Sequence, residues 1–90
     1  MRYYDAMNNK HRKTLLAIFA SPVKASIPWN DIESLFFACG GQIKRGSGSR
    51  VRVNINGVFA TFHRHHPQPT TDKGAVKSVR EFLENAGVKP

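Results

Sequence analysis

The chain has 90 residues, enough for a single domain, 1–90, with one modest core, and too few for a deep substrate cavity. Its 14 Lys and Arg against six Asp and Glu give a formal net charge of +8, which favours a polyanion such as nucleic acid as the partner. The hydrophobic fraction of 40% excludes a disordered basic tail, and no segment approaches the ~20 apolar residues of a membrane-spanning helix.

The N-terminal part predicts a loosely ordered segment followed by a helix. Residues 1–9 have no hydrophobic period and lack the apolar run of a signal peptide, so we expect a cytoplasmic protein. Asn8 or Asn9 can cap a helix over 10–20. Its apolar stripe consists of Leu15, Leu16 and Phe19. Basic residues in its first turns oppose the helix dipole unless an anion binds there, and we expect His11 among them to be solvated.

A second helix follows a linker over 21–27 that contains a proline. Pro28 suits the first helical position, and Asp31 and Glu33 lie at the end of the helix where the dipole favours acidic residues. Gly40-Gly41 ends the helix. Its apolar positions are Trp29, Ile32, Leu35, Phe36 and Cys39.

The single cysteine, Cys39, cannot form a disulfide within the chain, so nothing ties the protein to an oxidising compartment. Because Cys39 falls on the apolar face of the second helix, we interpret it as a core residue and not as a nucleophile.

Three strands are predicted next, over 42–45, 50–55 and 58–63. Asn56-Gly57 favours a two-residue type I′ turn, which sets the register of the last two strands. On the core face, Ile55 pairs with Val58, Val53 with Ala60, and Val51 with Phe62. On the opposite face, Asn54 pairs with Phe59, Arg52 with Thr61, and Arg50 with His63.

A last helix is predicted after Pro67 and Pro69, with Thr70 or Thr71 as its cap and an end near Ala86. Its apolar positions are Val76, Val79, Phe82, Leu83 and Ala86. They repeat the spacing of the second helix, so we expect these two helices to lie side by side on one face of the sheet.

The other face of the predicted sheet gathers positive charge around an aromatic ring. Arg50 and Arg52 suit phosphates, and an exposed Phe59 offers a surface on which a base can stack. Flanking residues expected near its margins are Lys44, Arg45 and Arg64. A solvated charged face, or a ring that covers the sheet or docks a protein, would explain the same residues. Combined with the net charge, the pattern favours RNA binding.

Three of the four histidines lie in His63-Arg64-His65-His66, before a proline. The sequence lacks the further cysteine or carboxylate pair that would complete a zinc site there, so no metal is expected. The alternative chemistry is metal-free RNA cleavage, in which histidine moves protons and arginine stabilises the charge on phosphorus. His63 opposite Arg50 supplies both groups, although the cluster can also be a structural connection to the last helix.

The loop Gly46-Ser47-Gly48-Ser49 lacks the lysine of a nucleotide-binding phosphate loop and opens no helix. We interpret it as a strand connection whose backbone amides can approach an RNA phosphate, with Ser49 in a positioning role.

Short motifs over about two-thirds of the chain resemble the HicA family of toxins, which have a double-stranded-RNA-binding-domain-like fold. The matching stretches are 31–36 with Gly40-Gly41, Gly48-Ser49-Arg50, and His66-Pro67 with 73–79 and 86–88. The resemblance implies a toxin that cleaves mRNA, needs no metal or organic cofactor, and is neutralised by a HicB antitoxin covering its active surface. It also implies a supporting role for His66, the histidine that matches the family.

The chain departs from the family at one sensitive place, because Arg50 or its neighbour Val51 occupies the position of the signature histidine used in cleavage. Either His63 replaces that histidine from the adjacent strand, or the chain binds RNA or a partner without cleaving.

We therefore predict an α+β domain of the double-stranded-RNA-binding-domain type. A three-stranded antiparallel sheet packs against two helices within a core over 28–88, and the helix over 10–20 is an addition. The leading function is a ribonuclease toxin whose partners are mRNA and a HicB-like antitoxin, with no membrane and no small-molecule ligand. The alternatives are a non-catalytic RNA- or DNA-binding domain and a protein-interaction module with a basic face. The candidate catalytic residues are His63, Arg50 and His66. The candidate RNA-binding residues are Lys44, Arg45, Ser49, Arg52, Phe59, Arg64 and His65.

Overall fold

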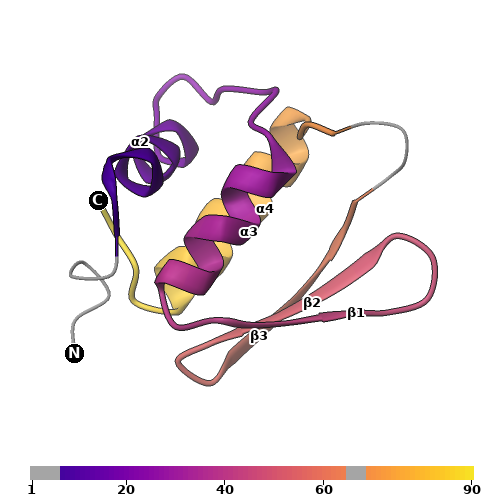
Figure 1. The fold of residues 1–90 in the computed structure, drawn as a ribbon. Coiled ribbons are helices and arrows are strands. Elements are labelled where there is room, and N and C mark those ends of the chain that lie inside the picture. The colour runs from indigo at the N-terminus through magenta and orange to yellow at the C-terminus, as the bar shows by residue number, and fades with distance from the viewer. Residues whose placement is uncertain (1–6, 65–68) are drawn as a thin grey trace.

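The computed structural model describes residues 7–64 and 69–90, and it has the predicted α+β architecture (Figure 1). The elements are α2 (Asn9–Ile18), α3 (Trp29–Ala38), β1 (Gln42–Arg45), β2 (Arg50–Ile55), β3 (Val58–His63) and α4 (Lys73–Asn85). The sheet is antiparallel with the order β1-β2-β3. Helices α3 and α4 cover one face of the sheet, and α2 lies on their far side as a third layer (Figure 1). Within the described ranges, no helix is both long and apolar enough to cross a membrane.

The β2–β3 hairpin has the register that its turn predicts. All six pairs are confirmed, from Ile55 opposite Val58 at the turn to Arg50 opposite His63 at the far end. Asn56 and Gly57 have φ values of 53° and 80°, as a type I′ turn requires. The Asn56 side chain donates a hydrogen bond of 2.8 Å to the carbonyl oxygen of Ala86, which ties the turn to the C-terminal end of α4.

The core lies between the sheet and the two covering helices. Val53 and Ile55 of β2 are fully buried, as alternation along the strand predicts. At the centre, the Phe62 ring of β3 stacks on Phe36 of α3 at 5.9 Å and meets Phe82 of α4 edge-on at 5.7 Å. These contacts fix both helices on one face of the sheet and leave the opposite face uncovered.

Helix α2 differs from the prediction in its length, its buried face and the role of His11. It is capped by Asn8 and ends at Ile18. Its buried residues are Thr14, Leu15 and Ile18, whereas Leu16 is 59% exposed. The helix ends early because the Arg80 guanidinium of α4 donates to the carbonyl oxygens of Ile18 and Ala20, which satisfies them without a further turn.

His11 was predicted to be solvated, and it is partly exposed, but its ring also makes structural contacts. Its Nδ1 accepts a hydrogen bond from the backbone N–H of Asn8, and its Nε2 lies 2.7 Å from the hydroxyl oxygen of Ser34 on α3. Because Nδ1 accepts, Nε2 carries the proton and donates to Ser34. The ring therefore links the cap of α2 to α3. Met7 is also buried, and Asn8 and Asn9 form the cap and the first residue of α2.

The segments that precede α3 and α4 pair with each other through backbone hydrogen bonds. Pro28, expected as the first helical residue, is the N-cap of α3 and bridges Thr70. Thr71 is not a cap, because its buried hydroxyl exchanges hydrogen bonds with the backbone of Ile27. Asp72 caps α4 instead, accepting from the N–H of Ala75 at 2.7 Å.

Candidate functional site

The uncovered side of the sheet, called the open face here, carries three rows of side chains from adjacent strands. The row nearest the hairpin turn contains Gln42, Asn54 and Phe59; the middle row contains Lys44, Arg52 and Thr61; the last row contains Arg50 and His63. Neighbouring rows are about 7 Å apart, because every second residue of a strand faces the same side. The open face therefore offers amides and a ring at one end and an arginine–histidine pair at the other.

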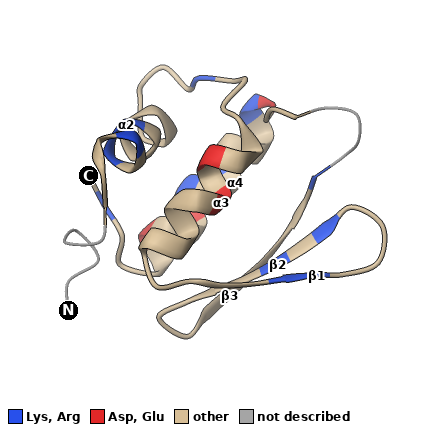
Figure 2. Ribbon diagram, viewed as in Figure 1, with Lys and Arg blue, Asp and Glu red and all other residues tan. Residues whose placement is uncertain are grey.

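The described strands carry four Lys and Arg residues and no acidic residue, whereas the helices carry both signs of charge. Figure 2 shows Lys and Arg on β1 and β2, while the acidic residues lie on the helices. Among residues 7–64 and 69–90, every Asp and Glu belongs to α3, α4 or the N-cap of α4. No described carboxylate on the strands offsets Lys44, Arg50 and Arg52, so the open face attracts anions.

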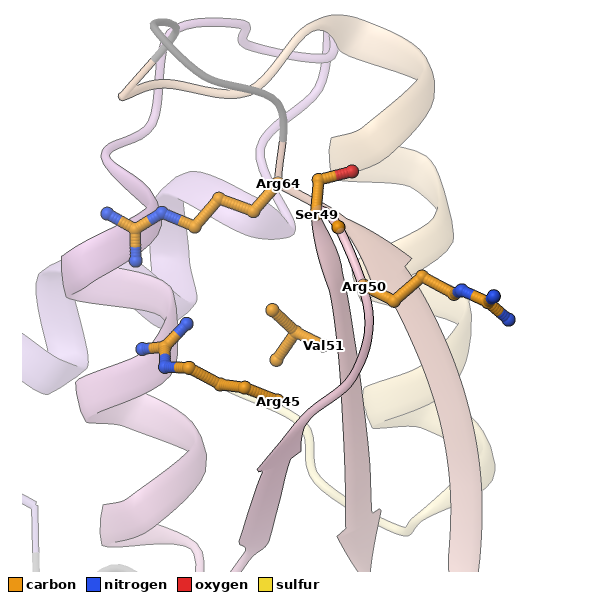
Figure 3. Close-up of a pocket in the computed structure, with 6 residues that line it drawn as sticks. Arg45, Ser49, Arg50, Val51 and Arg64 are labelled. Atoms are coloured by element: carbon orange, nitrogen blue, oxygen red, sulfur yellow. The ribbon is translucent and has the colours of Figure 1, made fainter.

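Arg50 and His63 are direct cross-strand partners, and both are exposed. Residues opposed in this way have Cβ atoms about 5 Å apart, so one phosphate can contact both side chains. Figure 3 shows the Arg50 side chain pointing away from Arg45 and Arg64, toward the open face.

The Phe59 ring is 58% exposed, and the guanidinium of Arg52 lies over it at 5.2 Å from the ring centre. Beside them is a shallow groove of about 330 Å³. It is lined by Gln42, Lys44, Arg52, Val53, Asn54 and Phe59. An exposed aromatic ring with an arginine over it provides two flat surfaces on which a base can stack.

Arg45 and Arg64 are not at the margins of the open face, as expected from the sequence, but on the side of the sheet that faces α3. Both guanidiniums bond the carboxylate of Glu33 at 2.6 Å, and Arg64 also donates to the side-chain oxygen of Asn30 at 2.8 Å. The cause is the pleat of the strand, which places Arg45 on the same face as its partner Val51.

Sequence reasoning missed the role of Glu33, which is only 6% exposed. The signal was present, since Glu33 falls between Ile32 and Leu35 in the apolar stripe of α3. A carboxylate at such a position requires cationic partners, because an unpaired buried charge is costly.

A second groove, of about 370 Å³, lies at the end of the sheet near these arginines (Figure 3). It is lined by Arg45, Gly48, Ser49, Arg50, Val51 and Arg64. Ser49 accepts a hydrogen bond of 2.8 Å from the N–H of Arg64 through its carbonyl oxygen. The groove thus joins the loop before β2 to the end of β3. His65 and His66, both candidate site residues, lie outside the described residues.

Cys39 lies in the core, as predicted, and is 6% exposed. Burial raises the pKa of its thiol to about 11, so it is protonated at neutral pH and is a poor nucleophile. In the part of the chain that the structure describes, no group of three or more His, Cys, Asp or Glu side chains is arranged to hold a metal ion.

A comparison with protein families finds one match. The family model described as "HicA toxin of bacterial toxin-antitoxin" matches residues 29–88, which run from the start of α3 to just beyond α4. The comparisons with curated proteins and with solved structures gave no match. The family match includes the whole sheet and both covering helices, and it leaves out α2.

Proposed function

Because the chain belongs to the HicA family of toxins from bacterial toxin–antitoxin systems, we propose that it binds and cleaves mRNA on the open face. We further propose that a HicB-like antitoxin neutralises it by covering that face. The observation that carries the proposal is the pairing of Arg50 with His63 on an exposed surface rich in cations.

In the proposed reaction, His63 takes the proton from a ribose 2′-hydroxyl, and the 2′ oxygen attacks the adjacent phosphorus. The bond from phosphorus to the 5′ oxygen of the next nucleotide breaks, and an acid returns a proton to that oxygen. The products are a 2′,3′-cyclic phosphate and a 5′-hydroxyl end. Arg50 neutralises the charge that develops on the phosphorus oxygens. His66 is proposed as a supporting group, and its position lies outside the described residues.

The remaining candidates divide into phosphate and base contacts. Lys44 and Arg52 form the row next to the catalytic pair and would hold neighbouring phosphates. Ser49 lines the groove beside Arg50 and would position the RNA strand there. His65, which follows β3 in the sequence, would have the same role. Arg45 has a side chain that is 63% exposed despite its bond to Glu33, so its remaining N–H groups can still meet a phosphate, whereas Arg64 is only 18% exposed.

Replacing His63 by Ala tests the proposal. After induced expression, the unaltered chain should arrest growth and produce RNA fragments with 5′-hydroxyl ends. The His63→Ala variant should cleave at least about 100-fold more slowly, since general acid–base catalysis contributes that much or more. Lys77→Ala, at an exposed position on α4, is the control for expression and folding. Undiminished cleavage by His63→Ala would refute the catalytic role of that residue.

A second function, RNA binding without cleavage, is favoured by the resemblance to the family, in which Arg50 or Val51 takes the position of the signature histidine. Purified protein that retards RNA on a gel and leaves its length unchanged would support that function over the nuclease.

A further inference from the structure

We propose that the groove beside the hairpin turn is a subsite for a purine base of single-stranded RNA. This inference rests on the proposed RNA-binding function and adds to it a base preference at a defined place. Its residues are Gln42, Lys44, Arg52, Asn54 and Phe59, of which Gln42 and Asn54 have no other proposed role.

The groove combines a stacking surface with hydrogen-bond donors. Phe59, at 58% exposure, provides a ring on which a base can stack, and the Arg52 guanidinium over it provides another plane. A purine covers more of such a surface than a pyrimidine does, because it has two fused rings. The ring therefore favours purines through contact area alone.

The Asn54 side chain is oriented so that it can form a hydrogen bond with the edge of that base. Its side-chain oxygen accepts a hydrogen bond of 3.1 Å from the N–H of Gly57 in the turn, which fixes the orientation of the amide. The amino group at the other end of the same amide makes no hydrogen bond to the residues that the structure describes. That amino group can donate to a base.

Gln42 completes the donor set, and Lys44 beside it is placed to hold a phosphate of the same strand. Gln42 lies directly opposite Asn54 and Lys44 lies in the next row, so both face the same groove. Amide N–H groups can donate to the N7 acceptor that adenine and guanine share. The polar groups can therefore bind the edge of a purine that the ring favours through its stacking area.

The subsite is separated from the reacting phosphate. Asn54 and Arg50 are four residues apart on β2, so the two sites lie about 13 Å apart along the strand. A base held by Phe59 thus belongs to a nucleotide that flanks the cleavage point. The subsite would direct where the strand is cut without taking part in the chemistry.

Binding of short RNA oligomers tests the subsite. Fluorescence anisotropy would be measured with labelled 12-mers of A, C and U that are 2′-O-methylated throughout, because these cannot be cleaved through the 2′ oxygen. The unaltered chain should bind the A oligomer about tenfold more tightly than the C or U oligomers, equivalent to ~1.4 kcal/mol.

The variant Phe59→Ala should bring this ratio close to one, and Gln42→Ala should lower it, while binding of the C and U oligomers remains salt-dependent. Phe37→Ala is the matched control, since Phe37 is 60% exposed but lies on α3, and it should keep the preference. Circular dichroism would verify that all three variants fold.

The possible outcomes separate the two proposals. Equal, salt-dependent binding of all three oligomers, or a purine preference that survives in Phe59→Ala, would overturn the subsite and leave RNA binding in place. Failure of the unaltered chain to bind any oligomer would overturn both, as expected if the open face binds only a protein.

Discussion

Glu33 holds together three parts of the chain that are far apart in sequence. Its carboxylate lies on α3 and bonds Arg45 at the end of β1 and Arg64 just beyond β3, both at 2.6 Å. Because the carboxylate is buried, its charge depends on these two partners for compensation. The three side chains therefore set how the far end of the sheet sits against α3.

Glu33→Gln should lower the free energy of unfolding by about 2 kcal/mol, because it leaves the guanidinium of Arg64 partly buried without a counter-charge. Urea denaturation followed by circular dichroism measures the change. Glu84→Gln, at an exposed position on α4, is the matched control and should shift stability by less than about 0.5 kcal/mol. Equal midpoints for the two variants would contradict the role assigned to Glu33.

Cys39 makes the stability of the fold depend on pH in the alkaline range. Burial raises the pKa of its thiol to about 11, so the unfolded chain ionises at lower pH than the folded one. The free energy of unfolding is therefore unaffected by this thiol below the ordinary pKa, and it falls as pH rises from there toward about 11. Relative to Cys39→Ala, the unaltered chain should lose stability only in that alkaline range.

Thermal melts of both proteins across neutral and alkaline pH provide the measurement. A difference between them that stays constant up to pH about 11 would contradict the shifted pKa. A thiol reagent at neutral pH should likewise modify the folded chain far more slowly than the unfolded chain.

The hairpin is the element on which the open face depends, because its turn decides which side chains point outward. Gly57 has a φ of 80°, and an added Cβ there would meet open space, so the cost of a side chain comes from the backbone conformation alone. Gly57→Ala should therefore destabilise the protein by about 1–2 kcal/mol.

Gly46→Ala is a matched control for this change. Gly46 also lies in a strand connection, and a Cβ there would make only an ordinary contact of 3.6 Å with Arg50. Chemical denaturation should give Gly46→Ala a stability near that of the unaltered chain. Equal losses for the two variants would show that the turn conformation is not the source of the cost.

Elements with a local signal were predictable from the sequence. The register of β2 and β3 follows from Asn56-Gly57, and the shared apolar spacing of α3 and α4 places them on one face. The predicted cap of α4 was wrong because the Thr71 hydroxyl instead bonds the backbone of Ile27, 44 residues away. The length of α2 and the role of His11 likewise depend on α4 and α3, which a local pattern cannot reveal.

The same distinction applies to the candidate site. The pairing of Arg50 with His63 and the exposure of Phe59 follow from alternation along two strands. The placement of Arg45 and Arg64 was wrong because it depends on a buried carboxylate from another element. The functional roles of all these residues remain proposals.

At the scale of the whole molecule, the presence of Lys and Arg without acidic residues on the described strands predicts how binding responds to salt. The strands carry Lys and Arg, and the described acids lie on or next to α3 and α4 (Figure 2). Each phosphate neutralised on a single strand changes the slope of log K against log salt by about −0.7. Lys44→Ala should therefore make the slope shallower by about 0.7 for every RNA sequence.

Titrations at several salt concentrations with the uncleavable oligomers provide the measurement. Lys77→Ala removes the same charge from α4, on the other side of the sheet, and should leave the slope nearly unchanged. Equal effects of the two variants would show that net charge alone, and not the open face, attracts RNA.

The outer layer formed by α2 has a practical consequence for such experiments. It is attached to the helical layer by the two hydrogen bonds that Arg80 donates to its C-terminal end and by the His11–Ser34 contact. It lies on the opposite side of that layer from the strands (Figure 1). A dye or surface linker attached at Lys13, which points to solvent, would be separated from the strands by the two covering helices. Immobilised in this orientation, the molecule would present its sheet outward to ligands in flow, free of interference from the support.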